Sequence, residues 1–209
     1  EMLRSLVGSE MCIRDRKKEV IFHSRSRTKT VYFVYSGEVM LYNLTKHGNR
    51  KVIFILGKGR LLNQSIVSKK PNALFCEAAC PVQILEIAEE PFLHLMEQSH
   101  DLTRAVLREY ERNLWRMGHQ LKNTTGNMQM ERKIAAKLWK LGRDFGVDTE
   151  DGVMIDIDLT ITLMADLVGA PRENVSRACK VLTDRGLIRY GNKRFILTDS
   201  DGLAEFYKM

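Results

Sequence analysis

Residues 172 to 177 carry four polar side chains whose spacing fits one face of a helix. They are Arg172, Glu173, Ser176 and Arg177, and residues three and four apart are neighbours on a helix surface. Arginine donates two hydrogen bonds to guanine O6 and N7, glutamate accepts one from cytosine N4, and serine adapts to several bases. The set therefore predicts base reading in the major groove of double-stranded DNA. The alternative is an ordinary solvated charged face.

The elements around this strip predict a helix-turn-helix. Thr160 is placed as the N-cap of a first helix, ITLMADLV, and Gly169 permits a tight turn into a second helix. Pro171 suits the first turn of that second helix. The apolar residues of this helix are expected to pack inward, and they are Val175, Ala178, Cys179 and Leu182. The polar strip is then left on the outside.

The segment after the second helix predicts a wing. GLIRYGNKRFILTD is typical of a strand, a turn at Gly191 and Asn192, and a second strand, although an ordinary surface hairpin has the same pattern. Residues 170–194 hold seven Lys or Arg against two acidic residues, so positive charge is concentrated where DNA would lie. We expect phosphate contacts from side chains that flank the base-reading strip: Thr160, Lys180, Lys193 and Arg194.

A long amphipathic helix is expected upstream, within residues 99–127, which we interpret as a dimerisation helix and hinge. Its apolar stripe consists of Leu102, Val106, Tyr110, Leu114, Met117 and Leu121. A narrow stripe of this length needs a partner, and a parallel homodimer is our interpretation. The alternative is that the stripe packs on the strands that precede it.

Residues 17–98 predict an antiparallel β-roll. Six short runs of apolar or alternating residues are separated by glycines and a proline: EVIFH, TVYFVY, EVMLYN, KVIFIL, ALFCEAA and VQILEI. The residues from Lys46 to Asn49 between two of these runs are typical of a hairpin turn. The expected fold class is α+β: a jelly-roll-like N-terminal β-roll, a long helix, and a winged helix-turn-helix over residues 128–209.

Composition limits the setting of the protein. The chain has 209 residues, a formal net charge of +7 and 44% hydrophobic residues, without an apolar run that would span a membrane. Its four cysteines are too scattered for a disulfide framework, so we expect a cytoplasmic protein. Residues 1–16 show no clear periodicity, and VGSEMCIRDR resembles a translated sequencing adaptor. We therefore treat this segment as a doubtful, non-native one.

The motifs, taken in order, resemble the Crp/Fnr family of transcription regulators. The matching pieces are KKEVIF, YFVYSGEVMLY, GKG, the long helix and LTITLMADLVGAPRENVSRACKVLTDRGLI. The resemblance implies a β-roll that senses a small molecule or a redox signal, a homodimer, and a palindromic operator. RNA polymerase is a further partner that it implies.

The implied effector pocket departs from the cyclic-nucleotide pattern. It comprises Leu61, Asn63, Gln64, Asn72 and Ala73. Members that bind cyclic nucleotides have Gly-Glu and Arg-Ser or Arg-Thr pairs at the matching positions, and a buried phosphate without its arginine is an uncompensated charge. Arg25–Ser26 also replaces an expected Gly-Asp turn. We therefore expect an effector other than cAMP.

Other classes of function are weaker fits. A cupin-like enzyme needs several histidines and a carboxylate around a metal, and only two histidines, His23 and His47, fall in the predicted roll. Cys76 and Cys80 do not complete a tetrahedral metal site. We expect no enzyme activity, no metal and no cofactor. A protein-binding adaptor that uses the winged helix for partner contact is the second alternative.

Overall fold

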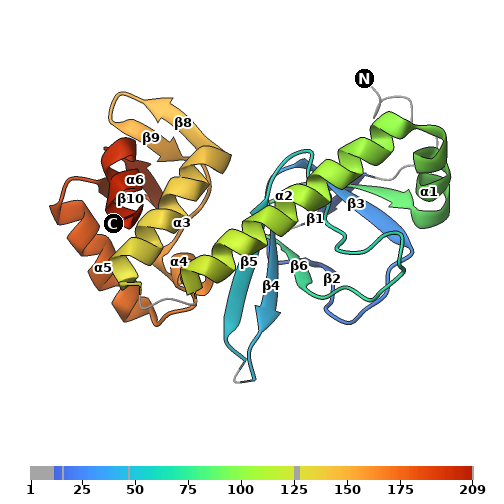
Figure 1. The fold of residues 1–209 in the computed structure, drawn as a ribbon. Coiled ribbons are helices and arrows are strands. Elements are labelled where there is room, and N and C mark those ends of the chain that lie inside the picture. Colours follow the sequence, from blue (N-terminus) through green and yellow to red (C-terminus); the bar gives the residue numbers. More distant parts are fainter. Residues whose placement is uncertain (1–11, 16, 47, 125–127, 209) are drawn as a thin grey trace. The chain divides into compact units, whose positions relative to one another are not determined.

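A computed structural model describes residues 12–15, 17–46, 48–124 and 128–208 (Figure 1). The chain divides into two compact units, residues 1–43 with 53–119 and residues 44–52 with 120–209. Most of the doubtful segment 1–16, His47 of the expected hairpin turn and residues 125–127 of the expected hinge lie outside the described residues.

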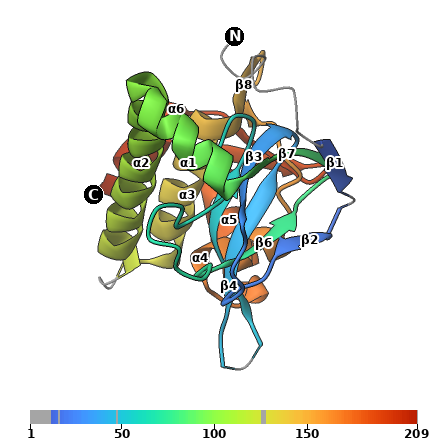
Figure 2. The same cartoon turned by 90° about the vertical axis from the view of Figure 1, so that its right-hand side faces the viewer.

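The β-roll consists of two sheets, ordered β1-β7-β3 and β2-β6-β4-β5 (Figure 2). The pairs β1–β7, β3–β7, β2–β6 and β4–β6 are antiparallel. Each of the six predicted runs contains a strand. The strands are β1 (Cys12–Asp15), β2 (Val20–Phe22), β3 (Thr30–Ser36), β4 (Val39–Leu44), β5 (Arg50–Leu56), β6 (Phe75–Ala78) and β7 (Val82–Ala88).

Strand β1 lies in the segment for which no element was predicted. Cys12 is opposite Leu85 and Asp15 is opposite Val82, so this strand extends the sheet at β7. Residues of the longer strands build the core between the two sheets, with Val39 and Ile84 among those without exposed surface. Buried and part-buried residues alternate at the start of β7, whereas the first four residues of β4 are all buried, so strict alternation describes only part of the roll.

Two helices follow the roll, α1 (Glu89–Gln98) and α2 (His100–Thr124). Helix α1 begins two residues before Pro91 and packs against β3 and β7. The predicted stripe of α2 is divided. Val106 is buried in a cluster with Leu61 and Phe92, and Leu102 and Tyr110 pack against that cluster, whereas Leu114, Met117 and Leu121 are exposed. The first half of the stripe therefore packs on the roll, as the alternative had it.

The second unit is a winged helix domain with a four-stranded sheet ordered β10-β11-β9-β8. Its core includes Ile134, Leu138, Leu159, Leu182 and Phe195. Its elements are α3 (Met130–Phe145), β8 (Gly146–Thr149), β9 (Gly152–Ile155), α4 (Ile161–Val168), α5 (Arg172–Asp184), β10 (Ile188–Gly191), β11 (Arg194–Leu197) and α6 (Ser200–Lys208).

The acidic DTEDG segment, residues 148–152, is typical of a loop by its sequence, yet its first two residues belong to strand β8. The structure pairs Asp148 with Val153 and Thr149 with Gly152 in a tight hairpin. Gly146 ends α3 with φ −75°, so a left-handed cap is not its reason for being glycine. A Cβ there would lie 2.1 Å from the Gly142 carbonyl oxygen. The close approach of helix and strand therefore requires glycine.

Candidate nucleic-acid interface

The helix-turn-helix forms where the sequence predicted it. The Thr160 hydroxyl oxygen accepts a hydrogen bond of 3.1 Å from the Leu163 backbone N–H, which caps α4. Gly169 ends α4 in the left-handed conformation, with φ 73° and ψ 48°. Pro171 is the residue directly before α5 rather than a member of its first turn. Thr160 therefore marks the start of α4, Gly169 marks its end, and Pro171 marks the start of α5.

Helix α5 presents a polar strip to solvent. Its four apolar residues, Val175, Ala178, Cys179 and Leu182, are buried as expected, and α5 packs against α3 and α4. The exposed face contains the four predicted base-reading side chains and one predicted phosphate contact, which are Arg172, Glu173, Ser176, Arg177 and Lys180. The structure thus places these five side chains together on one accessible helix face.

One neighbour of this strip was missed by the sequence analysis. The Arg177 Nη2 atom donates a hydrogen bond of 2.6 Å to the Asn174 Oδ1 atom, one turn earlier on α5. A charge-assisted bond of this kind limits the guanidinium's freedom while leaving other N–H groups available. The i, i+3 spacing of asparagine and arginine was the signal that could have identified Asn174 as a hydrogen-bond partner of Arg177.

The wing turn is shifted by one residue from its predicted place. Gly191 pairs with Arg194, so the two turn residues are Asn192 and Lys193 instead of Gly191 and Asn192. Both have positive φ, 49° and 60°, which is the signature of a type I′ hairpin turn. The Lys193 carbonyl accepts a hydrogen bond of 2.7 Å from the Leu159 N–H, which ties the wing to the start of α4. The Lys193 side chain is exposed.

Two arginines of the wing are held by acidic partners. Arg194 pairs with Asp156, and Arg189 pairs with Asp151, in both cases through a guanidinium nitrogen. The two carboxylates and Arg189 are exposed, so each pair contributes little stability on its own. Arg194 was expected to contact phosphate, and in the unbound protein its guanidinium is directed to Asp156 instead.

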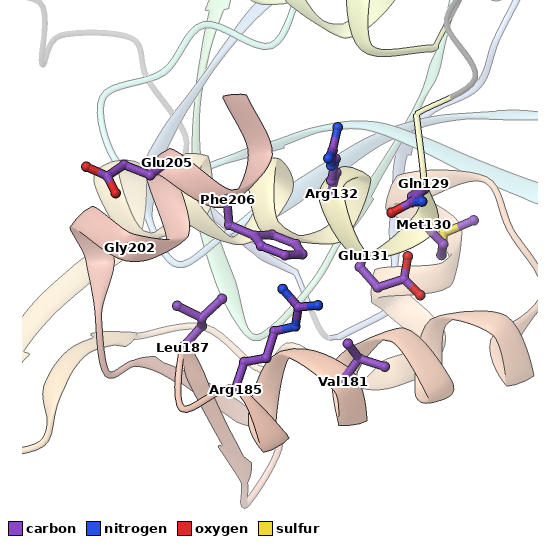
Figure 3. A pocket seen from close by; sticks show the side chains of 10 residues that line it. All are labelled: Gln129, Met130, Glu131, Arg132, Val181, Arg185, Leu187, Gly202, Glu205 and Phe206. Atoms are coloured by element: carbon purple, nitrogen blue, oxygen red, sulfur yellow. The ribbon is translucent and has the colours of Figure 1, made fainter. Parts of the chain in front are cut away.

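A groove of about 910 Å³ lies between α3, α5 and α6 (Figure 3). The Arg185 guanidinium stacks on the Phe206 ring, with 4.9 Å between them. The charged residues that line the groove are Arg132 and Arg185 together with Glu131 and Glu205, so positive and negative side chains balance. The groove therefore lacks the positive excess of a phosphate-binding surface.

Two residues of the predicted effector pocket, Asn63 and Gln64, form hydrogen bonds to the main chain of the roll through their side chains. Asn63 is buried: its Oδ1 accepts from the Tyr32 N–H at 2.8 Å, and its Nδ2 donates to the Thr30 carbonyl at 2.8 Å. Gln64 Oε1 accepts from the backbone N–H groups of Ala73 and Leu74, at 3.1 and 3.4 Å. Both carboxamides thus satisfy main-chain groups of the roll.

The other three residues of that pocket have different surroundings. Leu61 faces the cluster beneath α1 and α2, Ala73 is exposed, and Asn72 is buried. The structure brings Gln64 and Ala73 together and places Leu61 in another part of the core. The five residues are therefore not shown to line one cavity.

Cys80 and Cys179 have thiols that stay protonated near neutral pH. The Cys80 thiol donates a hydrogen bond of 2.8 Å to the Glu38 carboxylate. Burial, followed by that bond, raises the pKa of Cys80 to about 11, and burial raises the pKa of Cys179 to about 11. Thiolates are the nucleophiles and metal ligands, so neither group is prepared for that chemistry.

Among the described residues, His, Cys, Asp and Glu side chains form no group of three that could hold a metal ion. Within the same residues, the helices are too short or too polar to span a membrane.

Known proteins share both units. The family model of the Crp-like helix-turn-helix domain matches residues 132–206, and that of the cyclic nucleotide-binding domain matches residues 14–99. A CRP-like cAMP-activated global transcriptional regulator of Mycobacterium tuberculosis is 25% identical over 175 residues, which cover 83% of this chain and 78% of that protein. The global nitrogen regulator of Synechocystis is 24% identical over 194 residues, which cover 91% and 85%.

Solved structures share the fold. The structure of FixK2 from Bradyrhizobium japonicum superimposes with a TM-score of 0.81 at 19% identity, over 94% of this chain and 96% of that one. A β-roll, a long helix and a winged helix-turn-helix define a DNA-binding transcription regulator with a ligand-sensing domain. The chain belongs to the Crp/Fnr family, whose members are regulators rather than enzymes.

Proposed function

We propose that this regulator binds a palindromic operator as a homodimer, with α5 in the major groove of each half-site. The observation that carries the proposal is the exposed polar strip on a helix whose opposite face is buried. Arg172, Glu173, Ser176 and Arg177 read base edges, and Asn174 positions the Arg177 guanidinium.

Four further side chains bind the DNA backbone. Lys180 and Lys193 are exposed cations, and the Thr160 hydroxyl keeps its proton to donate while its oxygen caps α4. Arg194 exchanges its Asp156 partner for a phosphate when DNA binds, because an exposed ion pair costs little to open. These contacts position the protein, and the α5 strip supplies sequence specificity.

The homodimer forms through the C-terminal half of α2, where Leu114, Met117 and Leu121 are exposed. Leu114 is 71% exposed and Trp115 is 59% exposed, which is unusual for large apolar side chains on one helix. Burying each side chain against a second copy removes apolar surface from water at about 25 cal/mol per Å². We place this dimer in the cytoplasm, with RNA polymerase as a further partner.

The roll senses a redox signal or a small molecule other than cAMP. The relative from M. tuberculosis is named as cAMP-activated, but this chain has Asn72 where a phosphate-binding arginine would be needed. The hydrogen bonds of Asn63 and Gln64 to the main chain support the same conclusion, because a cyclic nucleotide would have to displace them.

A salt series with duplex DNA tests this function. Phosphate contacts release counterions, so log affinity should fall linearly with log salt, by about 0.9 for each phosphate neutralised. Binding to a preferred duplex should exceed binding to a random duplex by about 10³-fold or more. Weak binding that ignores sequence would instead indicate a protein-binding adaptor.

A further inference from the structure

Two loops of the β-roll are held side by side. One joins β2 to β3 and the other precedes β6 (Figure 1). The Arg25 N–H donates to the Asn72 carbonyl at 2.7 Å, and the Asn72 N–H donates to the Ser26 carbonyl at 2.9 Å. The Ser24 hydroxyl adds a bond of 3.1 Å to the Ala73 carbonyl. The two loops therefore form one surface.

That surface is strongly positive. Arg25, Arg27, Lys69 and Lys70 are exposed, and within the part of the chain that the structure describes none of them forms an ion pair. Residues 20–76 contain ten Lys or Arg and a single acidic residue, Glu38. Glu38 accepts the Cys80 hydrogen bond at another turn. The four exposed cations therefore lie on loops that have no acidic residue of their own.

The backbone and the buried groups of these loops are unusual as well. Arg25 has φ 64° and Lys69 has φ 52°, a left-handed conformation that residues other than glycine rarely adopt. Asn72, between the loops, is 4% exposed, and its Nδ2 atom has no hydrogen-bond partner. Backbone strain and unsatisfied polar groups concentrate at binding sites, where a ligand compensates for them.

We propose that these two loops bind a small anion with several negative charges, carried by neighbouring phosphate or carboxylate groups. The proposal rests on the sensing role given to the roll above and names the chemical class of its effector. Four exposed cations suit a multiply charged ligand at the surface, unlike the buried single phosphate for which the roll lacks an arginine.

A contact leads from this surface toward α2. The second loop continues from Asn63 and Gln64, and the Gln64 carboxamide accepts from the Ala73 N–H. The Asn63 carbonyl accepts a hydrogen bond of 3.4 Å from the Tyr110 hydroxyl on α2. A ligand that neutralises the loops would therefore favour one arrangement of the helix proposed to form the dimer.

The test uses the full-length protein and isothermal titration at constant ionic strength, with inorganic tripolyphosphate and citrate as separate probes and sulfate as the reference. The variants are Lys69→Ala with Lys70→Ala, and Arg25→Gly, which removes a charge where glycine relieves the backbone. Lys58→Ala, an exposed cation on another turn, is the matched control. We expect saturable binding of one probe, weakened at least 10-fold by both loop variants and unchanged in the control.

Three results would overturn the proposal: no saturable binding beyond sulfate, an equal loss in Lys58→Ala, or binding that leaves operator affinity unchanged. Displacement of the probe by random duplex DNA would overturn it too, because the surface would then be a nucleic-acid contact. Operator binding by the unliganded protein is measured separately. If the protein fails to bind the operator both with the probe and without it, the proposed DNA-reading function is refuted instead.

Discussion

Arg177→Ala removes the side chain that we assign to base reading. A bidentate arginine–guanine contact discriminates against the wrong base by about 1–3 kcal/mol, which is about 5-fold to 150-fold in affinity. A symmetric dimer loses this contact at both half-sites, so the affinity for the preferred operator should fall by about 2–6 kcal/mol. The substitution should lower the folding stability only slightly, because Arg177 is exposed and its described hydrogen bond is to Asn174 on the same helix.

Fluorescence anisotropy on the preferred operator and on a set with one base pair changed measures this loss. Arg177→Ala should lose its preference at one position of each half-site and keep the others. Arg177→Lys keeps the charge without the planar fork, so it should lose the same preference with a smaller loss of overall affinity. Lys193→Ala should weaken all sequences alike. If Arg177→Ala and Lys193→Ala both lose affinity equally on every sequence, the division between base reading and backbone contact is wrong.

Three further predictions concern the helix cap, the dimer and the thiol. Thr160→Ala should destabilise the winged helix unit by about 1 kcal/mol, with Thr160→Ser close to wild type, and an unchanged melting curve would contradict the cap. Leu114→Asp should halve the mass seen by light scattering and weaken operator binding, while Arg108→Asp, on the charged side of α2, should leave the dimer intact; a Leu114→Asp dimer would refute the interface. The raised pKa of Cys80 means that its stabilising effect is complete below about 9 and is lost as pH rises through about 11, so chemical unfolding of wild type should become easier over that interval relative to Cys80→Ala. Parallel curves for the two proteins would contradict this.

Apolar periodicity was sufficient to predict the elements that bury a face. The short apolar runs TVYFVY and KVIFIL predicted strands β3 and β5, and the helical spacing in PRENVSRACKVL predicted α5 with its buried side. Strand β8 was missed because all four of its residues are exposed, so no apolar signal marks it. The wing turn was placed one residue early, since its register is set by the pairing of Ile188 with Leu197.

The candidate site shows the same limit. The composition of α5 predicted which side chains face outward, because burial of Val175 and Leu182 fixes the rotation of the helix. The partners of those side chains are tertiary or depend on rotamers, so the pairing of Arg194 with Asp156 could not be read from the sequence. The division of the α2 stripe at Tyr110 likewise depends on how far the roll extends along the helix.

The most direct test of the central claim is selection of bound sites from random duplexes by the full-length protein. A symmetric dimer should enrich two inverted half-sites whose centres lie about one helical turn, or about 34 Å, apart. Arg177→Ala should relax one symmetric pair of positions in the enriched sequence. Enrichment of a single half-site, or of no sequence at all, would contradict the proposal that a symmetric pair of α5 helices reads DNA.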